Sequence, residues 1–556
     1  MNDTARATDF LESLETIRDL IEVAARSLAA TCAVNGKLDA KTLDQNQVAC
    51  YELALIYAEY RSAAVTQAVL SDLLDESVSP LQHALCSLHI AEAIQSIKSR
   101  MDILLPEFKI EQSAFDKVFS CAHLQKMLRF HLAAERMAEI GSAIIEQQGD
   151  TGQLALDEEK TMMQEAFRRL AEDVIKPRAE SIHRHDLTVP EEILQPLREM
   201  GVFGISVPQS YGGIAPDDAH DNISMIVVTE ALSEASLAAG GSLITRPEIM
   251  TRALLSGGTE EQKSRWLPDI ASGNTLCGIA ITEPDYGSDV AGLSLKAKPV
   301  EGGFLLNGAK AWCTFAGKAQ LLFVIARIRS DKSLGHKGLS AFLVEKPSTE
   351  DHEFSFEQND GGRLTGKAIA TIGYRGMHSY DLVFEDYFVP SENLIGGEEG
   401  VGKGFYLAMA GLTGGRIQTA ARASGVMRAA LGASARYASD RKVFGAALGD
   451  YQLTQAKIAK MAARVAACRY FTYGVGELLD HGGGQMEASL VKLFACRSAE
   501  WITREALQIH GGMGYAEETP VSRYFVDARV LSIFEGAEET LALKVIARDL
   551  LQTVLQ

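Results

Sequence analysis

The spacing of apolar residues changes twice along this chain, and the change restricts the folds open to it. Up to about residue 275, apolar side chains recur every three to four positions, which predicts amphipathic helices. From about 281 to 390 the period shortens towards two, as in FLLNGAKAWCTF and GLSAFLVEK, with turn residues between the segments. The helical period then returns and continues to the end. We therefore expect a mainly α protein with a small, central, antiparallel β domain.

The length of the chain predicts several domains, because 556 residues exceed what one hydrophobic core supports. Four helical segments precede the polar stretch EQQGDTGQLALDEE, which is typical of a linker. We divide the chain into an N-terminal helical bundle, a second helical domain, a β domain and a C-terminal helical bundle, with boundaries at 1–150, 155–279, 280–392 and 393–556.

Composition excludes several classes of partner and site. The net charge of −19 argues against nucleic acid and against anionic membrane surfaces. The eight cysteines are scattered without a CxxC pair, which argues against a zinc or iron–sulfur site and favours a reducing compartment. No apolar run has the length of a membrane span, and the acidic N-terminus does not have the pattern of a secretion signal. We expect a cytoplasmic protein.

The segment Phe534-Glu535-Gly536 places one carboxylate between an aromatic ring and a glycine, just before a final amphipathic run. Apolar surroundings raise the pKa of a carboxylate towards the range in which a general base works. A Glu at a helix start is also a common helix-dipole partner, and this alternative stays open on the segment alone.

A second candidate site lies in GIAITEPDYGSDVAGL, where Thr282 and Ser288 flank a turn that exposes hydroxyl and backbone N–H groups. Further on, the two-residue period places Trp312 and Thr314 on one face of a predicted strand. An aromatic plane beside a hydroxyl suits a flat, hydrogen-bonding ligand. The alternatives are a connecting loop for the first segment and a core tryptophan for the second.

Five motifs follow one another between residues 282 and 536: TEPxxGSD, GxKxWxT, DRKVFG, LQIHGGMGY and FEG. In this order the chain resembles the acyl-CoA dehydrogenase family from about residue 155 to the end. The resemblance implies the fold of that family, a helical domain, an antiparallel β domain and a C-terminal four-helix bundle, to which this chain adds its N-terminal bundle. It also implies FAD at a dimer interface, an acyl-CoA substrate, and an electron-transfer flavoprotein as acceptor.

The resemblance assigns two groups of FAD contacts. One group surrounds the flavin: Thr282, Ser288, Trp312 and Thr314. The other group reaches the pyrophosphate and adenosine of the neighbouring subunit's FAD: Arg441, Phe444, Gln452, Gln508, Gly511 and Gly512. An arginine neutralises an anionic pyrophosphate, and glycines allow close approach of the backbone.

The same resemblance makes Glu535 the catalytic base, which takes the α-proton while the β-hydrogen leaves as hydride to the flavin. Phe534 and Gly536 flank it in the substrate site, and Arg416 helps to position the base loop and the CoA chain. Some relatives carry the base beside the arginine of the LTGGRIQ segment, but Gly415 stands there in this chain. Ala537 replaces a threonine that commonly contacts the flavin in the family, so the resemblance implies no hydroxyl contact from this position.

The acyl group is expected to be chosen in SLAAGGSLITRPEIMTRALLSGG, where an arginine is unusual for a pocket that holds an alkyl tail. Arg246 is the first candidate and Arg252 the second, with a solvated surface arginine as the alternative for both. An inward arginine would pair with a carboxylate and would indicate a short dicarboxylic acyl-CoA. Relatives that oxidise glutaryl-CoA read the carboxylate with an arginine that aligns with Gly240 here, so that substrate is disfavoured.

Three other functions remain open on sequence grounds: a short- or branched-chain acyl-CoA dehydrogenase, an acyl-CoA oxidase, and a non-enzymatic scaffold of the same fold. The N-terminal bundle carries no catalytic signature. We hypothesise that it covers a surface through which dimers of typical family members pair into tetramers, which predicts a homodimer; a solution mass of four chains would contradict this.

Overall fold

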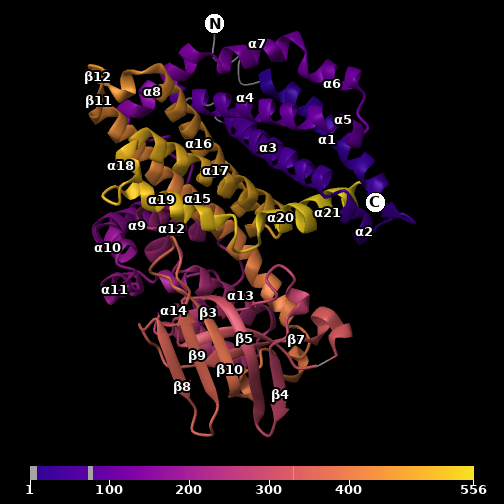
Figure 1. Cartoon of the computed structure of the whole chain (residues 1–556), viewed down its shortest axis with the longest axis vertical. Coiled ribbons are helices and arrows are strands. Elements are labelled where there is room, and N and C mark those ends of the chain that lie inside the picture. Colours follow the sequence, from indigo (N-terminus) through magenta and orange to yellow (C-terminus); the bar gives the residue numbers. More distant parts are fainter. Residues whose placement is uncertain (1–8, 73–78, 330) are drawn as a thin grey trace. The chain divides into compact units, whose positions relative to one another are not determined.

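The computed structural model describes residues 9–72, 79–329 and 331–556 (Figure 1). The chain forms two compact units. The first unit combines Met1–Asp157 with Thr419–Gln556, and the second comprises Glu158–Gln418. The N-terminal bundle therefore shares a unit with the C-terminal helices, although more than 260 residues of sequence separate them.

The N-terminal part of the first unit is helical, as its apolar spacing predicts. Its elements are α1 (Asp9–Cys32), β1 (Ala33–Val34), β2 (Lys37–Leu38), α2 (Ala40–Gln45), α3 (Gln47–Asp72), α4 (Pro80–Ile103), α5 (Leu105–Phe108), α6 (Gln112–Phe119), α7 (Ala122–His131) and α8 (Ala134–Glu146). The fourth apolar segment is two helices rather than one, because the backbone of Ala133 is extended and interrupts it.

Long and short helices together form the C-terminal part of the same unit. They are the later residues of α15 (Gly404–Asp440), then α16 (Gln452–Asp480), α17 (Gln485–His510), α18 (Gly512–Tyr515), α19 (Pro520–Leu531), α20 (Glu538–Thr540), the π-helical segment η11 (Leu541–Ala547) and α21 (Arg548–Thr553), with a small hairpin of β11 (Lys442–Val443) and β12 (Ala446–Ala447). Helix α3 packs against α16, α17 and η11, and one apolar core joins α1, α3 and α4 to α16, η11 and α21.

A buried histidine makes the first unit sensitive to acid. His89 Nε2 lies 3.0 Å from Ser62 Oγ and is 1% exposed. Burial, followed by the charge of Arg464, lowers the pKa of His89 well below its ordinary 6.5. The folded state therefore binds fewer protons than the unfolded state below pH 6.5, and stability is lost as the pH falls through that value.

We expect the denaturant midpoint of wild type to drop between pH 7.5 and pH 5.5, with His89 contributing about 1.4 kcal/mol per pH unit below 6.5. His89→Gln removes this titration and keeps a hydrogen-bonding partner for Ser62. Its midpoint should drop less over the same interval; an identical drop in both proteins would show that His89 is not responsible.

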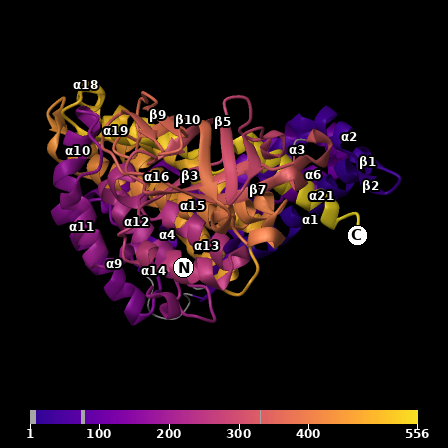
Figure 2. The same ribbon diagram turned by 90° about the horizontal axis from the view of Figure 1, so that it is seen from below.

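The second unit begins with helices that surround one end of a sheet (Figures 1 and 2). These are α9 (Glu158–Leu170), η2 (Ala171–Ile175), α10 (Lys176–Arg184), α11 (Glu191–Glu199), α12 (Asn222–Ala235), η5 (Leu237–Gly241), α13 (Thr245–Gly257) and α14 (Glu260–Ala271). Helix α14 starts with a capping box. The Thr259 hydroxyl accepts from the backbone N–H of Gln262, and the Gln262 side-chain oxygen accepts from the backbone N–H of Thr259.

The sheet has the strand order β3-β6-β4-β5-β10-β9-β8, with β7 paired to β6. The strands are β3 (Cys277–Ala280), β4 (Lys296–Val300), β5 (Gly303–Thr314), β6 (Leu321–Arg327), β7 (Leu339–Glu345), β8 (Glu353–Glu357), β9 (Arg363–Ala368) and β10 (Ser379–Pro390). Most pairings are antiparallel, as expected, but β3 and β4 pair with β6 in parallel. The sheet is therefore mixed, and β3, β8 and β9 are strands that the apolar period did not predict.

Strand β6 shows why this part of the chain reads as a continuous apolar run. All its residues are buried. Leu321, Phe323 and Ile325 face one core, shared with α13 and α14, whereas the alternate residues face a second core within the sheet domain. A strand covered on both faces needs apolar residues at every position.

None of the helices within the described residues has the length and apolar content required to cross a bilayer.

Candidate functional site

The loop that carries Glu535 follows α19 and has an unusual backbone. Glu535 has φ of 54° and Gly536 has φ of 100°. A non-glycine residue in the left-handed region costs about 1–2 kcal/mol, so its surroundings must hold it there. The backbone N–H of Glu538 donates to the carbonyl of Ser532 at 3.0 Å and closes the loop. Glu535 itself is half-buried.

Two buried cations, from helices α17 and α15, hold this loop. Lys492 on α17, 1% exposed, donates to the carbonyl oxygen of Gly536 at 2.6 Å. The guanidinium of Arg422, fully buried on α15, lies 4.7 Å from the centre of the Phe534 ring. Both residues flanking Glu535 are thus fixed by side chains from other helices, so the carboxylate is presented on a supported turn.

A separate group of predicted residues lies at one end of the helices of the first unit. Helices α16 and α17 are consecutive and pack together, so the start of α16 and the end of α17 lie at the same end. Tyr437, near the end of α15, stacks on His510 at the end of α17 with ring centroids 4.2 Å apart. The predicted residues at this end are all exposed: Arg441, Phe444, Gln452, Gln508, Gly511 and Gly512.

Phe444 is the most exposed apolar residue of this group. It lies at the tip of the β11–β12 hairpin, where Phe444 and Gly445 have φ of 50° and 90°. Two consecutive positive φ values are typical of the tight turn that joins two short antiparallel strands. The turn leaves the Phe444 side chain 101% exposed, which places an aromatic ring where a ligand or partner can cover it.

In the second unit, a β-bulge aims Trp312. Leu382 pairs with Lys310 and Tyr380 with Cys313, so two residues of β5 oppose one of β10. Trp312 lies in this bulge with φ of 57° and is 57% exposed, whereas Cys313 is fully buried. Bulges of this kind turn a side chain out of the regular alternation. Thr314, next on the same side, has its Oγ1 2.9 Å from Ser379 Oγ.

The turn with Thr282 and Ser288 is fastened to β5 by a buried ion pair. Lys310, fully buried, donates to Glu283 at 2.8 Å, and Glu283 also accepts the backbone N–H of Ser294 and Leu295. Burial opposes the charged form of Glu283, but Lys310 and these N–H groups outweigh it and hold the carboxyl pKa below its usual value.

The same fastening brings Thr282 beside the bulge, since its carbonyl accepts the N–H of Ala311 at 2.8 Å. Ser288 lies further along the turn and is exposed. The structure therefore brings Thr282, Trp312 and Thr314 together along one end of β5. Glu535 belongs to the other unit, so its meeting with these residues in one active site stays a prediction.

Arg246 and Arg252 lie on α13 and differ in what they contact. Arg246 is 4% exposed and donates to the Ser242 carbonyl and to Tyr374 Oη, each at 3.1 Å. Arg252 pairs at 2.7 Å with Glu248, which is fully buried, and at 2.7 Å with Asn222 Oδ1. Among the described residues Arg246 contacts no carboxylate, whereas the charge of Arg252 is already neutralised by Glu248.

Position 240 has no room for a side chain. Gly240 lies in η5, and a Cβ atom there would stand 2.5 Å from the backbone oxygen of Leu232. Gly414 packs as closely, because a Cβ would stand 2.4 Å from Glu248 Oε1. Gly415 is buried and the following Arg416 is half-buried. This part of α15 thus lies against α13 and presents no carboxylate at position 415.

Sequence reasoning missed the residues that support these sites. Lys310 and Glu283 stand inside the quoted motifs but were given no role, and Arg422 and Lys492 were not considered. The available signal was a single cation among small or apolar neighbours, as in SLVKLFAC and TAARASG. A long charged side chain that such a run buries almost always has a partner, so these positions indicate a paired cation.

Comparison with known proteins matches most of the chain to one family. The models described as the N-terminal, middle and C-terminal domains of acyl-CoA dehydrogenase match residues 157–274, 278–387 and 402–551. A (2S)-methylsuccinyl-CoA dehydrogenase of Cereibacter sphaeroides is 34% identical over 546 residues, which is 97% of each protein.

Two solved structures show the extent of the shared fold. A chain in "Electron transferring flavoprotein of Acidaminococcus fermentans: Towards a mechanism of flavin-based electron bifurcation" is 31% identical, with a TM-score of 0.64 over 72% of this chain and 99% of that one. A glutaryl-coenzyme A dehydrogenase solved with glutaryl-CoA is 29% identical, with a TM-score of 0.64 over 72% of this chain and 96% of the other. The Cereibacter protein, by contrast, matches nearly the full length.

Proposed function

Since this chain belongs to the acyl-CoA dehydrogenase family and is an oxidoreductase that acts on the CH–CH group of an acyl-CoA, we propose that it oxidises (2S)-methylsuccinyl-CoA to mesaconyl-CoA. The observation that carries this choice is the buried Arg246, which has no carboxylate partner among the described residues. The likeness to the Cereibacter protein over 97% of both chains supports it.

The choice rests on the cost of burying charge. A guanidinium removed from water without an anion costs several kcal/mol, and a carboxylate in a dry pocket costs about as much. A substrate carboxylate that meets Arg246 would offset both costs through charge-assisted hydrogen bonds. A purely alkyl acyl group would leave the arginine without an anion. Gly240 has no room for a side chain at the position where the resemblance places the carboxylate-binding arginine of glutaryl-CoA relatives, which argues against glutaryl-CoA.

Family members are flavoproteins, and the residues of this chain fit FAD. The bulge leaves the Trp312 ring 57% exposed beside the hydroxyl of Thr314, which suits a flat heterocycle that also accepts hydrogen bonds. In the first unit, the space beside Gly511 and Gly512 is open: a Cβ atom at either position would meet no atom within 4 Å. A pyrophosphate can therefore approach the backbone there. When bound, FAD supplies the acceptor for the hydride.

The chain's own groups then orient the substrate and move one proton. Glu535 takes the α-proton, while its backbone N–H donates to the thioester carbonyl as negative charge develops on that oxygen. Phe534 and Gly536 shape the site on either side, and Arg416 contacts the CoA chain. The left-handed backbone of Glu535 lets a single residue present both its N–H and its carboxylate.

The partners are part of the same proposal. An electron-transfer flavoprotein is proposed as acceptor, which the likeness to the Acidaminococcus structure supports. The exposed Phe444 hairpin and Arg441 suit contact with FAD of a second subunit, and we propose a homodimer in which the N-terminal bundle covers the surface otherwise used for tetramers. All eight cysteines are free thiols, which is consistent with a cytoplasmic location.

The test is anaerobic mixing of the purified flavoprotein with a panel of thioesters while the flavin absorbance is followed. We expect (2S)-methylsuccinyl-CoA to bleach the flavin with kcat/KM at least about 100-fold above butyryl-CoA and isovaleryl-CoA. Faster bleaching by either alkyl substrate would replace the proposal with a short- or branched-chain dehydrogenase. Rapid reoxidation of the product-bound enzyme by oxygen would favour an acyl-CoA oxidase.

A further inference from the structure

The N-terminal bundle reaches the loop that carries Glu535. The contact is made by Tyr51, in the second turn of α3, and by Glu538, three residues after Glu535. Tyr51 lies outside the part of the chain that the family models match, which begins at residue 157. The loop is therefore supported by a region of the chain that lies outside the part matched by the family models.

Three side chains meet at this point. Tyr51 Oη and Arg497 Nη1 both donate to the same oxygen of Glu538, and Arg497 Nη1 lies 3.2 Å from Tyr51 Oη. The Glu538 side chain is 15% exposed and that of Arg497 39% exposed. Burial, followed by the hydrogen bond to Glu538, raises the pKa of Tyr51 to about 12, so the phenol stays a donor at all working pH values.

The two donors to Glu538 differ in rigidity. Arg497 is long and partly exposed, so its guanidinium can follow Glu538 if the loop shifts. Tyr51 has only two side-chain torsions, and its ring is fixed on a helix packed against α17 and η11. The hydroxyl of Tyr51 is thus the contact that sets where Glu538 stands.

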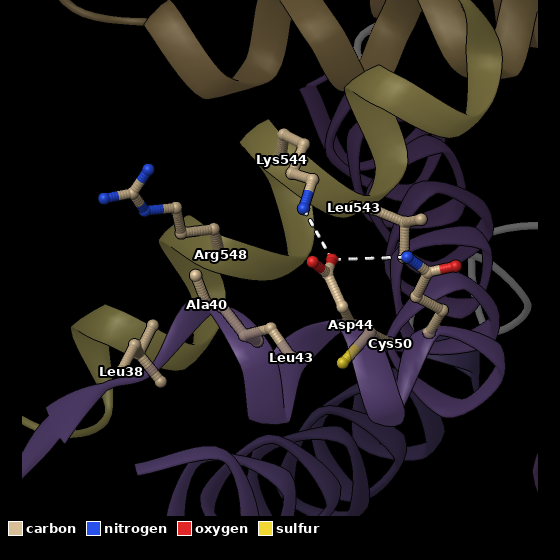
Figure 3. A pocket seen from close by; sticks show the side chains of 9 residues that line it. Leu38, Ala40, Leu43, Asp44, Cys50, Leu543, Lys544 and Arg548 are labelled. Carbon is tan, nitrogen blue, oxygen red and sulfur yellow. Dashed lines mark hydrogen bonds and ion pairs between the residues drawn. The ribbon is translucent and has the colours of Figure 1, made fainter. Parts of the chain in front are cut away.

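One other polar contact between the N-terminal bundle and η11 is more open to water. Figure 3 shows Lys544 of η11 pointing at Asp44, beside a pocket of about 150 Å³ whose apolar lining includes Leu43 and Leu543. This ion pair measures 2.6 Å, but both side chains are more than half exposed. Ion pairs that are this exposed contribute little to stability, because water screens them. The shielded contact with Glu538 is better placed to restrain the loop.

The loop needs restraint because it combines two left-handed residues with a short closure. Phe534 and Gly536, on either side of Glu535, are held by Arg422 and Lys492, as described above. The backbone N–H of Glu538 donates to the carbonyl of Ser532 and closes the loop, while the Glu538 side chain accepts the hydrogen bond from Tyr51. Movement of Glu538 would therefore move the turn that presents the base.

Building on the role proposed for Glu535, we propose that Tyr51 is a positioning residue for the reaction: its hydroxyl, acting through Glu538, holds the turn of Glu535 in the geometry needed for proton abstraction. The N-terminal bundle then has a function within catalysis in addition to its packing. Substrate affinity should depend little on Tyr51, because the carboxylate and the N–H of Glu535 act mainly in the transition state, as the proton leaves and negative charge develops on the thioester oxygen.

The test compares Tyr51→Phe with Tyr57→Phe, a matched control on the same helix whose hydroxyl contacts Arg61 at 3.4 Å and not the loop. Anaerobic stopped-flow mixing of each holoenzyme with (2S)-methylsuccinyl-CoA and with butyryl-CoA gives the limiting rate and amplitude of flavin bleaching. We expect Tyr51→Phe to slow the limiting rate about tenfold at full amplitude and unchanged half-saturation, and Tyr57→Phe to match wild type.

Two further measurements separate positioning from a folding defect. A folding defect lowers the bleaching amplitude, because fewer flavins are active, without changing the rate constant. If Tyr51 acts through Glu538, Tyr51→Phe should add no further loss in a Glu538→Ala background, as expected for coupled residues. Additive losses, or a wild-type rate in Tyr51→Phe, would overturn the inference.

Hydrogen exchange decides the inference independently of the substrate. Amides of residues 532–538 should exchange faster in Tyr51→Phe than in wild type or Tyr57→Phe. Equal exchange in all three proteins would overturn the positioning role even if the enzyme is active. A wild-type flavin that neither thioester bleaches would instead reject the proposed function, while the exchange data would still show whether Tyr51 holds the loop.

Discussion

We expect the Glu535→Gln variant to be yellow, to bind acyl-CoA and to leave its flavin oxidised. Glutamine keeps the shape of the side chain and the backbone N–H, and the anchors from Lys492 and Arg422 act on the neighbouring residues. Only the proton acceptor is removed. General-base catalysis is worth about 10²–10⁴-fold, and with no second carboxylate at position 415 we expect the bleaching rate to fall by about 10⁴-fold.

The control is Glu539→Gln, which changes an exposed carboxylate four residues further along. It should bleach at the wild-type rate. Binding of substrate to both variants can be followed by the perturbation of the flavin spectrum on titration. If Glu535→Gln bleaches within tenfold of wild type, the base lies elsewhere, and the assignment of this loop is wrong.

Replacing Arg246 with methionine should change which substrate the enzyme prefers. Methionine has a similar length and no charge, so the buried volume is largely kept. Truncating one partner of a buried charge pair costs about 2–5 kcal/mol, and we expect kcat/KM for (2S)-methylsuccinyl-CoA to fall at least about 100-fold. Butyryl-CoA has no carboxylate to lose, so its kcat/KM should change less than about threefold.

Arg265→Met is the matched control for this substitution. Arg265 lies on the adjacent helix α14, its side chain is 47% exposed, and it pairs with Glu345 at 3.0 Å. Its removal should affect neither substrate. Equal losses of Arg246→Met on both thioesters would mean that Arg246 only ties α13 to Tyr374, and the dicarboxylate proposal would then lose its main support.

The β domain shows how far apolar periodicity reaches. The segments FLLNGAKAWCTF and GLSAFLVEK lie where the sequence predicted strands, as β5 and β7. Strands β8 and β9 were not predicted, because EFSFE alternates over only five residues and RLTGKA contains glycine and charged residues that resemble a loop. Parallel pairing of β3 with β6 was also beyond the sequence, since it joins segments whose own patterns carry no information about direction.

The candidate residues show the same division. The motif order was sufficient to select Glu535, Trp312 and Phe444, but not their backbone geometry. All three have positive φ, and each does so for a reason that lies elsewhere: two buried cations for the base loop, an unmatched residue in β5 for the bulge, and a two-residue turn for the hairpin. Local backbone preference disfavours positive φ in residues other than glycine. Contacts with distant residues therefore have to impose these conformations, and a local sequence pattern does not predict them.

The family, the succession of helical and β segments and the residues in the motifs could be predicted from the sequence, because periodicity and motif spacing are local properties. Contacts in the folded protein were needed to show which arginine of α13 has no carboxylate partner among the described residues and which residues hold the base loop. Those questions depend on pairs far apart in the chain, such as Tyr51 and Glu538, which are separated by 487 positions. Burial and charge pairing arise when such residues meet, and no local pattern contains that information.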